Sequence, residues 1–139
     1  GITSEWGEFL YAMAKGEQYD LKTKKGFQIG VVCATPPFPY NDKEEMDIYR
    51  DLSIIFKKPN STDGVHLGDV KLVEGNWQIA GDSGYALVVT GSGTTVEDAR
   101  KQVYGRLENI LLQNMFYRTD IGVGWSEDSD KLQTWGYLY

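Results

Sequence analysis

Residues 85–114 read YALVVTGSGTTVEDARKQVYGRLENILLQN, in which a strand pattern is followed by a long helical pattern. The first six residues are mostly apolar and β-rich, which predicts a strand. After a glycine-containing link, Thr95 and Asp98 form a near match to a capping box. Apolar residues then return at helical spacing, at Val96, Ala99, Val103, Leu107, Ile110 and Leu111. The pattern predicts a helix over about 95–114, roughly 28 Å long, which suffices to cover one face of a small sheet.

The rest of the chain predicts short strands and one more helix. Apolar residues at helical spacing follow Ser4, and Gly16 is a typical helix stop, so a short helix is expected over about 4–15. Apolar, β-rich runs predict strands over 27–34, 52–56 and 65–67, and a hairpin with the loop Glu74-Gly75-Asn76. We therefore expect an α+β fold in which a mainly antiparallel sheet is covered by the long helix and the short N-terminal helix.

Three segments carry weaker patterns. The loop TPPFPYND (35–42) is stiffened by its prolines, which cannot donate to a sheet ladder. The acidic run 42–47 is interpreted as a solvated face near a turn. The tail VGWSEDSDKLQTWGYLY (123–139) is interpreted as an aromatic segment packed over the sheet, with an additional edge strand as the alternative.

Bulk properties favour one water-soluble globular domain over residues 1–139. The net charge of −6 argues against a nucleic-acid partner, because phosphate backbones are bound by clustered Lys and Arg. No run approaches the roughly 20 apolar residues of a membrane-spanning helix, so no membrane partner is expected. The lone Cys33 is expected to be a buried thiol, and cytoplasmic localisation is the simplest expectation. The chain begins at Gly1 rather than Met, as a fragment cut from a longer protein would.

The sequence contains no pattern of a self-sufficient active site. His66 is its one histidine, so a His-rich metal site is excluded, and nothing resembles zinc-cluster spacing. Ser83 lacks the frame of a nucleophile elbow. The run GSGTT (91–95) could hold a phosphate through its backbone, but it lacks the Walker lysine, and a tight strand-to-helix turn is the better interpretation. We therefore expect no catalytic and no metal-binding residue in this chain.

The segment MFYRTDIG (115–122) directly follows the long helix. Arg118 and Asp120 are two residues apart, so an extended backbone would place both side chains on one face. Such a pair can form an ion pair, or the arginine can present its donors to an anionic ligand. The residues favour the ion pair and leave the ligand open as the alternative.

Several of these motifs together resemble the C-terminal domain of phosphoribosylamine–glycine ligase, also called glycinamide ribonucleotide synthetase. The run GDSGYALVVTGSGTTVEDARKQVYGRLENI (81–110), followed by MFYRTDIG, is similar to the strand, long helix and F-Y-R-x-D-I-G motif of that family. Upstream, SEWGEFLYAMAKGE, IGVVCATPPFPY and VHLGDV resemble the opening helix, the first strand with its loop, and the F-H-A-G-T segment. The chain departs from the family at Tyr85-Ala86, which replace Gly-Arg, and at Pro36-Pro37-Phe38, which replace loop glycines.

The resemblance implies a supporting role in a larger enzyme of purine biosynthesis. The family belongs to the ATP-grasp ligases, and its ATP-grasp core lies upstream of this domain and is absent from Gly1–Tyr139. ATP and Mg²⁺ are implied for the full-length parent, whereas this domain alone is expected to bind no cofactor and to be inactive. The implied role is to brace the core and to wall the substrate cleft, with Arg118, Asp120, Gly122 and His66 as candidates. The implied partners are the upstream ATP-grasp core and the N-terminal domain of the same polypeptide.

Two alternatives stay open at this point. The chain could be a stand-alone binding module that kept the fold and lost the reaction, a reading suggested by its aromatic tail. It could also belong to an ATP-grasp ligase with other substrates, because a fold does not determine which substrates its site accepts.

Overall fold

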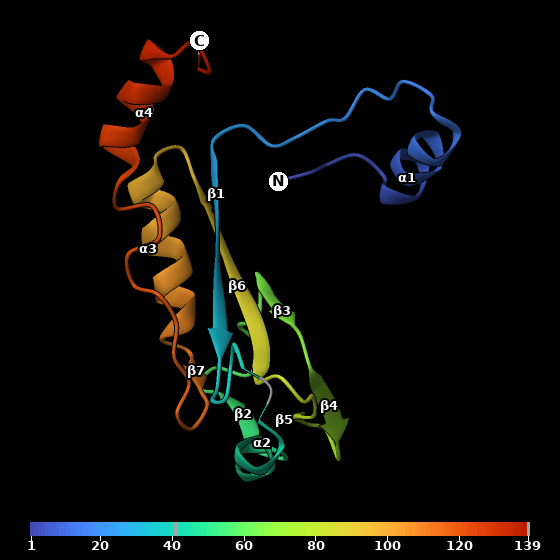
Figure 1. Cartoon of the computed structure of the whole chain (residues 1–139), viewed down its shortest axis with the longest axis vertical. Coiled ribbons are helices and arrows are strands. Elements are labelled where there is room, and N and C mark those ends of the chain that lie inside the picture. Colours follow the sequence, from blue (N-terminus) through green and yellow to red (C-terminus); the bar gives the residue numbers. More distant parts are fainter. Residues whose placement is uncertain (41, 139) are drawn as a thin grey trace.

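The long strand β6 (Tyr85–Gly93) and the helix α3 (Val96–Leu107) form the centre of the fold (Figure 1). The computed structural model describes residues 1–40 and 42–138. The remaining elements, in chain order, are α1 (Trp6–Lys15), β1 (Phe27–Ala34), α2 (Lys43–Tyr49), β2 (Ser53–Phe56), β3 (Val65–Leu67), β4 (Val70–Val73), β5 (Asn76–Ile79), β7 (Ile110–Leu111) and α4 (Trp125–Thr134). The predicted α+β class is confirmed.

One sheet has the order β1-β6-β3, with both pairs antiparallel. Alternate residues of β1 and β6 are buried, among them Val31 opposite Val89. These side chains join one core with the apolar stripe of α3, namely Val96, Ala99, Val103 and Leu107. The predicted arrangement of an antiparallel sheet under the long helix is therefore confirmed.

Two glycines at the end of β6 allow α3 to approach the strand closely. A Cβ on Gly91 would lie 2.5 Å from the Ala99 carbonyl oxygen and 2.7 Å from the Val103 nitrogen. A Cβ on Gly93 would lie 2.5 Å from the Ala99 nitrogen. The strand continues through both residues, and the turn into α3 begins only at Thr94, where Thr95 caps the helix by accepting a hydrogen bond from the Asp98 N–H. The glycines of GSGTT thus serve helix–strand contact.

The helix α3 ends at Leu107, well before residue 114, so the sequence prediction was wrong about its C-terminal part. Residues Ile110 and Leu111 instead form β7, which pairs antiparallel with β2. Ile110 is buried and Leu111 is half exposed, which is the alternation of a strand. Over so short a stretch the apolar spacing fits either period, and the pairing with β2 decides between them.

The predicted single sheet is in fact two sheets, because β2, β4, β5 and β7 form a second one with the order β4-β5-β2-β7. The chain leaves the edge of the first sheet at Gly68, whose N–H donates to the Ala86 carbonyl, and then begins β4. The predicted hairpin joins β4 and β5. Its two turn residues, Glu74 (φ 50°) and Gly75 (φ 82°), both have left-handed backbones, as tight hairpin turns require.

The acidic run forms a helix, α2, that the sequence analysis did not predict. Asp42 caps it by accepting a hydrogen bond from the Glu45 N–H at 3.1 Å. Met46 is fully buried in the core, while the acidic side chains of the run are exposed, as expected. A single buried residue on a short helix leaves too little periodicity to recognise from the sequence. Asn41, in the proline-containing loop before it, lies outside the described residues.

The two terminal helices lie outside the main core. The predicted N-terminal helix forms as α1, but it stands apart from both sheets and does not cover them (Figure 1). Its apolar side chains Trp6, Leu10, Tyr11 and Met13 are exposed. The prediction of one domain over 1–139 stays a prediction.

The tail contains the helix α4. The interpretation of residues 123–139 as an aromatic segment over the sheet, or as an edge strand, was therefore wrong for the described part, which ends at residue 138. Charged and polar residues fill most of α4, and only Trp125 reaches the core, where its ring lies 5.2 Å from that of Phe27. No helix in residues 1–40 and 42–138 has both the length and the apolar character needed to cross a bilayer.

We predict opposite effects for two Gly→Ala substitutions. Gly91→Ala should lower the free energy of unfolding by about 1–3 kcal/mol, because its Cβ would overlap the backbone of α3. Gly105→Ala should raise it by about 0.5–1 kcal/mol, because alanine favours the helix and its Cβ would meet nothing within 4 Å. Urea unfolding of both variants measures the difference, and equal stabilities would contradict the proposed close contact.

Candidate functional site

The segment 115–122 runs along the outer side of α3 (Figure 1). It starts with a bridge between Phe116 and Ala34, whose backbone groups exchange hydrogen bonds of 2.9 and 3.1 Å. Further along, the Tyr104 hydroxyl donates to the Arg118 carbonyl at 2.8 Å. The Arg100 guanidinium donates to the carbonyls of Thr119, at 3.1 Å, and of Ile121. Two side chains of α3 thus hold the segment by its backbone, which leaves its polar side chains free to face outward.

Arg118 and Asp120 form the ion pair that the sequence favoured. The Nε–Oδ1 distance is 2.8 Å and the Nη2–Oδ2 distance is 2.5 Å, so the pair is bidentate. The hydrogen bond from Arg118 lowers the pKa of Asp120, and the same bond raises the pKa of Arg118. Both side chains are exposed, by 74% and 57%. An exposed pair contributes little to stability, and an anionic ligand would have to compete with the carboxylate for the guanidinium.

Gly122 ends this segment at a point of close packing. Its φ of 80° is left-handed, and a Cβ there would lie 3.0 Å from Val96 Cγ1 and 3.3 Å from Ile29 Cδ1. The residue therefore has a packing reason to be glycine, since it lets the chain turn tightly against the core before α4.

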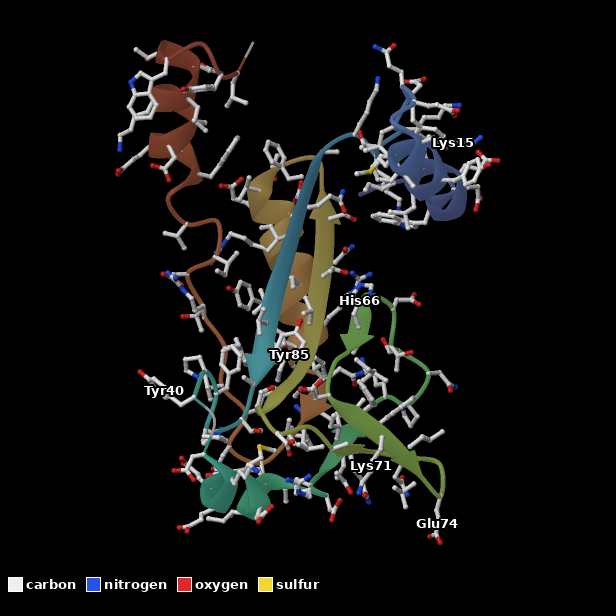
Figure 2. The ribbon with its side chains drawn as sticks, turned by 45° about the vertical axis from the view of Figure 1, so that its right-hand side comes forward. Lys15, Tyr40, His66, Lys71, Glu74 and Tyr85 are labelled. Carbon is white, nitrogen blue, oxygen red and sulfur yellow. The ribbon has the colours of Figure 1, made fainter. Side chains whose placement is uncertain are left out.

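His66 lies on β3, at the opposite edge of the first sheet and on the same side of the molecule as α1 (Figure 2). Its Nε2 is 3.2 Å from the Thr90 hydroxyl oxygen, and that hydroxyl donates to the Gly64 carbonyl at 3.2 Å. In the tautomer that carries its hydrogen on Nε2, the ring donates to Thr90, whose hydroxyl donates onward to Gly64. The Nδ1 atom of the neutral ring then remains an acceptor.

His66 belongs to a surface that we call the open sheet face, made of the residues that alternate with the core-facing ones: Gln28, Gly30, Val32, His66, Val88, Thr90 and Ser92. A hollow of about 410 Å³ lies over part of it and is also lined by Lys24 and Arg106. Hydroxyl, amide, imidazole and cationic groups converge there. From the sequence, only His66 of this set was a site candidate, and Ser92 was considered only within the run GSGTT, although the period-two alternation in β1 and β6 could have indicated the others.

The structure does not bring the four candidate residues together. His66 lies at the β3 edge, whereas Arg118, Asp120 and Gly122 follow the outer side of α3, and the sheet order places β6 and β1 between them. The candidates therefore define two separate places on the molecule.

The described residues offer no evident metal site or reactive nucleophile. In residues 1–40 and 42–138, no group of three or more His, Cys, Asp and Glu side chains is arranged to hold a metal ion. Cys33 is fully buried, and burial raises the pKa of its thiol to about 12. At neutral pH the thiol is therefore protonated and unreactive.

We predict that Arg100 matters more for stability than Arg118. Arg100→Ala should lower the free energy of unfolding by about 1–2 kcal/mol, because two backbone carbonyls of the segment lose a charged donor. Arg118→Ala should leave the melting temperature close to that of the native chain, because its ion pair is exposed. Urea unfolding and hydrogen exchange at 116–122 measure both effects. A larger loss of unfolding free energy for Arg118→Ala than for Arg100→Ala would contradict the interpretation that Arg100 holds the segment.

Comparison with known proteins places these features in context. Residues 28–124 match the family described as "Phosphoribosylglycinamide synthetase, C domain". The chain is 42% identical over 130 residues to the phosphoribosylamine–glycine ligase of Caulobacter vibrioides, covering 87% of this chain and 28% of that protein. It is 25% identical over 125 residues to the ligase of Streptococcus pneumoniae, covering 87% of this chain and 27% of the relative.

A solved structure supports the same fold. The phosphoribosylamine–glycine ligase of Thermotoga maritima superposes with a TM-score of 0.62 at 23% identity, over 80% of this chain and 26% of that one. The chain thus spans little more than a quarter of the length of the relatives that it matches.

Proposed function

Because this chain belongs to the phosphoribosylglycinamide synthetase C-domain family, we propose that it is the C-terminal accessory domain of an ATP-dependent phosphoribosylamine–glycine ligase-like enzyme. The proposed reaction of the whole protein joins glycine to phosphoribosylamine in purine biosynthesis, with ATP giving ADP and phosphate. In this proposal the chain contributes no catalytic residue. It braces the upstream core and forms one wall of the substrate cleft.

The observation that carries the proposal is the polar character of the open sheet face. A sheet face that packs against another protein layer presents mainly apolar side chains. On this face the polar side chains Gln28, His66, Thr90 and Ser92, with Lys24 beside them, outnumber the apolar Val32 and Val88. Such groups suit the wall of a water-filled cleft that holds hydroxyl- and phosphate-bearing substrates. His66 Nδ1 is the acceptor that we propose for a substrate hydroxyl or amine.

We propose Arg118, Asp120 and Gly122 as a second, weaker candidate for the cleft wall. Their segment is well ordered by Arg100 and Tyr104, and its ion pair faces outward. The pair would act at the rim of the cleft through its charges, because its direct donors are already engaged.

The proposed partner is the ATP-grasp core upstream in the same polypeptide, together with its N-terminal domain. The exposed apolar residues Trp6, Leu10, Tyr11 and Met13 on α1 support it, because clustered apolar side chains at a surface typically mark a protein contact. ATP and Mg²⁺ would be held by that core, and the cytoplasm is the proposed location of the whole protein.

We predict that His66→Ala in the full-length protein lowers kcat/KM by about tenfold, because the loss of one hydrogen bond to the substrate weakens binding by roughly this factor. The melting temperature should stay unchanged. Glu127→Gln, on the exposed side of α4, is the matched control and should retain full activity. Glycinamide ribonucleotide formation from glycine and phosphoribosylamine is the assay. Arg118→Ala, assayed in parallel, tests the second candidate wall.

Three results would count against the proposal. If the His66→Ala protein keeps native activity, the open sheet face does not line the substrate cleft. Turnover by the 139-residue chain alone would contradict its accessory role. If the full-length protein ligates another amine but not phosphoribosylamine, the proposed substrates are wrong although the fold is the same.

A further inference from the structure

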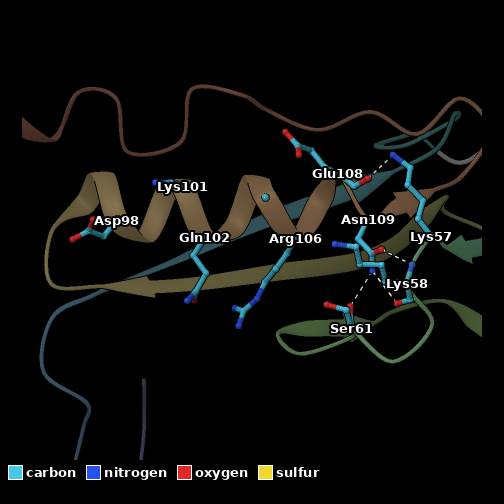
Figure 3. Close-up of a pocket in the computed structure, with 10 residues that line it drawn as sticks. Lys57, Lys58, Ser61, Asp98, Lys101, Gln102, Arg106, Glu108 and Asn109 are labelled. Carbon is cyan, nitrogen blue, oxygen red and sulfur yellow. Dashed lines mark hydrogen bonds between the residues drawn. The ribbon is translucent and has the colours of Figure 1, made fainter.

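A second hollow, of about 610 Å³, lies between α3 and the loop that follows β2 (Figure 3). We call it the α3–loop groove. The helix contributes Asp98, Lys101, Gln102, Gly105 and Arg106, the loop contributes Lys57, Lys58 and Ser61, and Glu108 and Asn109 close one end. Its volume is within the range of sites that hold small molecules.

Hydrogen bonds fix the loop to the end of the helix. The Asn109 side chain accepts from the Lys58 N–H at 2.7 Å and donates to the carbonyls of Lys58 and Ser61 at 3.3 and 3.0 Å. The Lys57 N–H donates to the Asn109 carbonyl at 2.9 Å, and Lys57 Nζ donates to the Glu108 carbonyl at 2.6 Å (Figure 3). The two walls therefore hold their separation without a ligand, which lowers the entropic cost of binding one.

Positive charge predominates in the groove although the chain as a whole carries −6. The lining has four cationic side chains, Lys57, Lys58, Lys101 and Arg106, against two carboxylates. Asp98 lies about 12 Å from Arg106 along the helix axis. The Glu108 carboxylate points away from Ser61 and Asn109 (Figure 3). Neither of the two lining carboxylates therefore lies at the end of the groove near the loop, and the cations there suit an anion.

Two donors on the helix side of the groove are held in place. Arg106 Nη1 donates to the Thr90 carbonyl at 2.6 Å, which fixes the guanidinium while leaving further N–H groups. The Gln102 side-chain oxygen accepts from the Ser92 N–H at 2.8 Å, so its amide nitrogen is left as a donor. With the Ser61 hydroxyl, these groups match the acceptor oxygens of a phosphate.

Gly105 is a second, independent observation. A glycine inside a helix costs about 0.5–1 kcal/mol relative to alanine, so it usually has a packing reason. None is present within the described chain, because a Cβ on Gly105 would meet no atom within 4 Å. The missing side chain instead leaves room in the groove, directly over the helix backbone.

We propose that the α3–loop groove binds a small phosphate monoester, most simply a sugar phosphate, at a site that shares only Arg106 with the hollow over the open sheet face. The phosphate would lie among Lys58, Arg106 and Ser61, with the polar body of the ligand over Gly105. None of the ten lining residues is aromatic, so the groove offers no stacking surface for a nucleobase. This favours a sugar phosphate over a nucleotide.

Calorimetric titration of the 139-residue chain tests this proposal, with ribose 5-phosphate as the probe and ribose and inorganic phosphate as comparators. Ribose 5-phosphate should bind saturably, at least about tenfold more tightly than ribose, because the charge-assisted hydrogen bonds require the phosphate. It should also bind more tightly than inorganic phosphate. Absence of saturable binding, or equal binding of inorganic phosphate, would overturn the assignment of a sugar phosphate.

Two variants locate the site. Gly105→Leu should retain or raise the melting temperature, since leucine favours helix, and should abolish binding by filling the groove. Lys58→Glu/Lys101→Glu should weaken binding by more than about tenfold. Lys43→Glu/Lys131→Glu makes the same change in net charge outside the groove and should bind as the native chain does. A folded Gly105→Leu protein that binds normally, or equal weakening by both charge pairs, would overturn the proposal.

Discussion

Close contact between α3 and β6 governs how the other elements of the core pack. Gly91 and Gly93 present no side chain to the helix, so the backbones of strand and helix approach until any Cβ would overlap. At that distance the stripe of Val96, Ala99 and Val103 reaches the buried residues of both β6 and β1. A single strand–turn–helix unit thus organises the core, and the second sheet extends that core through Ile54, Ile79 and Ile110.

The position of α3 also determines the surfaces available for function. Its inner side is occupied by the sheet. Its outer side holds the segment of Arg118 and Asp120 through Tyr104 and Arg100, and a third side faces the loop that follows β2. On the sheet face away from α3, polar side chains outnumber the apolar Val32 and Val88. The helix therefore keeps the segment of Arg118 and Asp120 apart from the other two surfaces, and its Arg106 lines both the hollow over the open sheet face and the α3–loop groove.

Charge has different consequences at these three places. In the Arg118–Asp120 pair the two charges satisfy each other, and solvent weakens their interaction. On the open sheet face, polarity comes mainly from neutral groups such as Thr90, Ser92 and His66. In the α3–loop groove, lysines and an arginine are gathered in a chain that is acidic overall. An ordered surface with unbalanced positive charge is the feature that most calls for an anionic ligand.

The sequence by itself determined the elements with a long, uninterrupted pattern and those marked by turn chemistry. The strand at 85, the start of α3 at its Thr95 cap and the Glu74-Gly75 hairpin follow from local propensities and capping, which act within a few residues. Motif order also indicated the family. The Arg118–Asp120 pair was predictable because both partners are two residues apart.

The remaining features arise from contacts between parts of the chain that are far apart in sequence. The sequence pattern of residues 110 and 111 fits a helix or a strand equally well, and their pairing with β2 makes them a strand. The helix α2 packs on the core through one buried methionine. Three further features depend on how distant parts of the chain are placed. They are the exposure of α1, the separation of His66 from Arg118, and the proximity of Lys58, Lys101 and Arg106. Such proximity depends on how the sheets and α3 pack, and no local pattern records it.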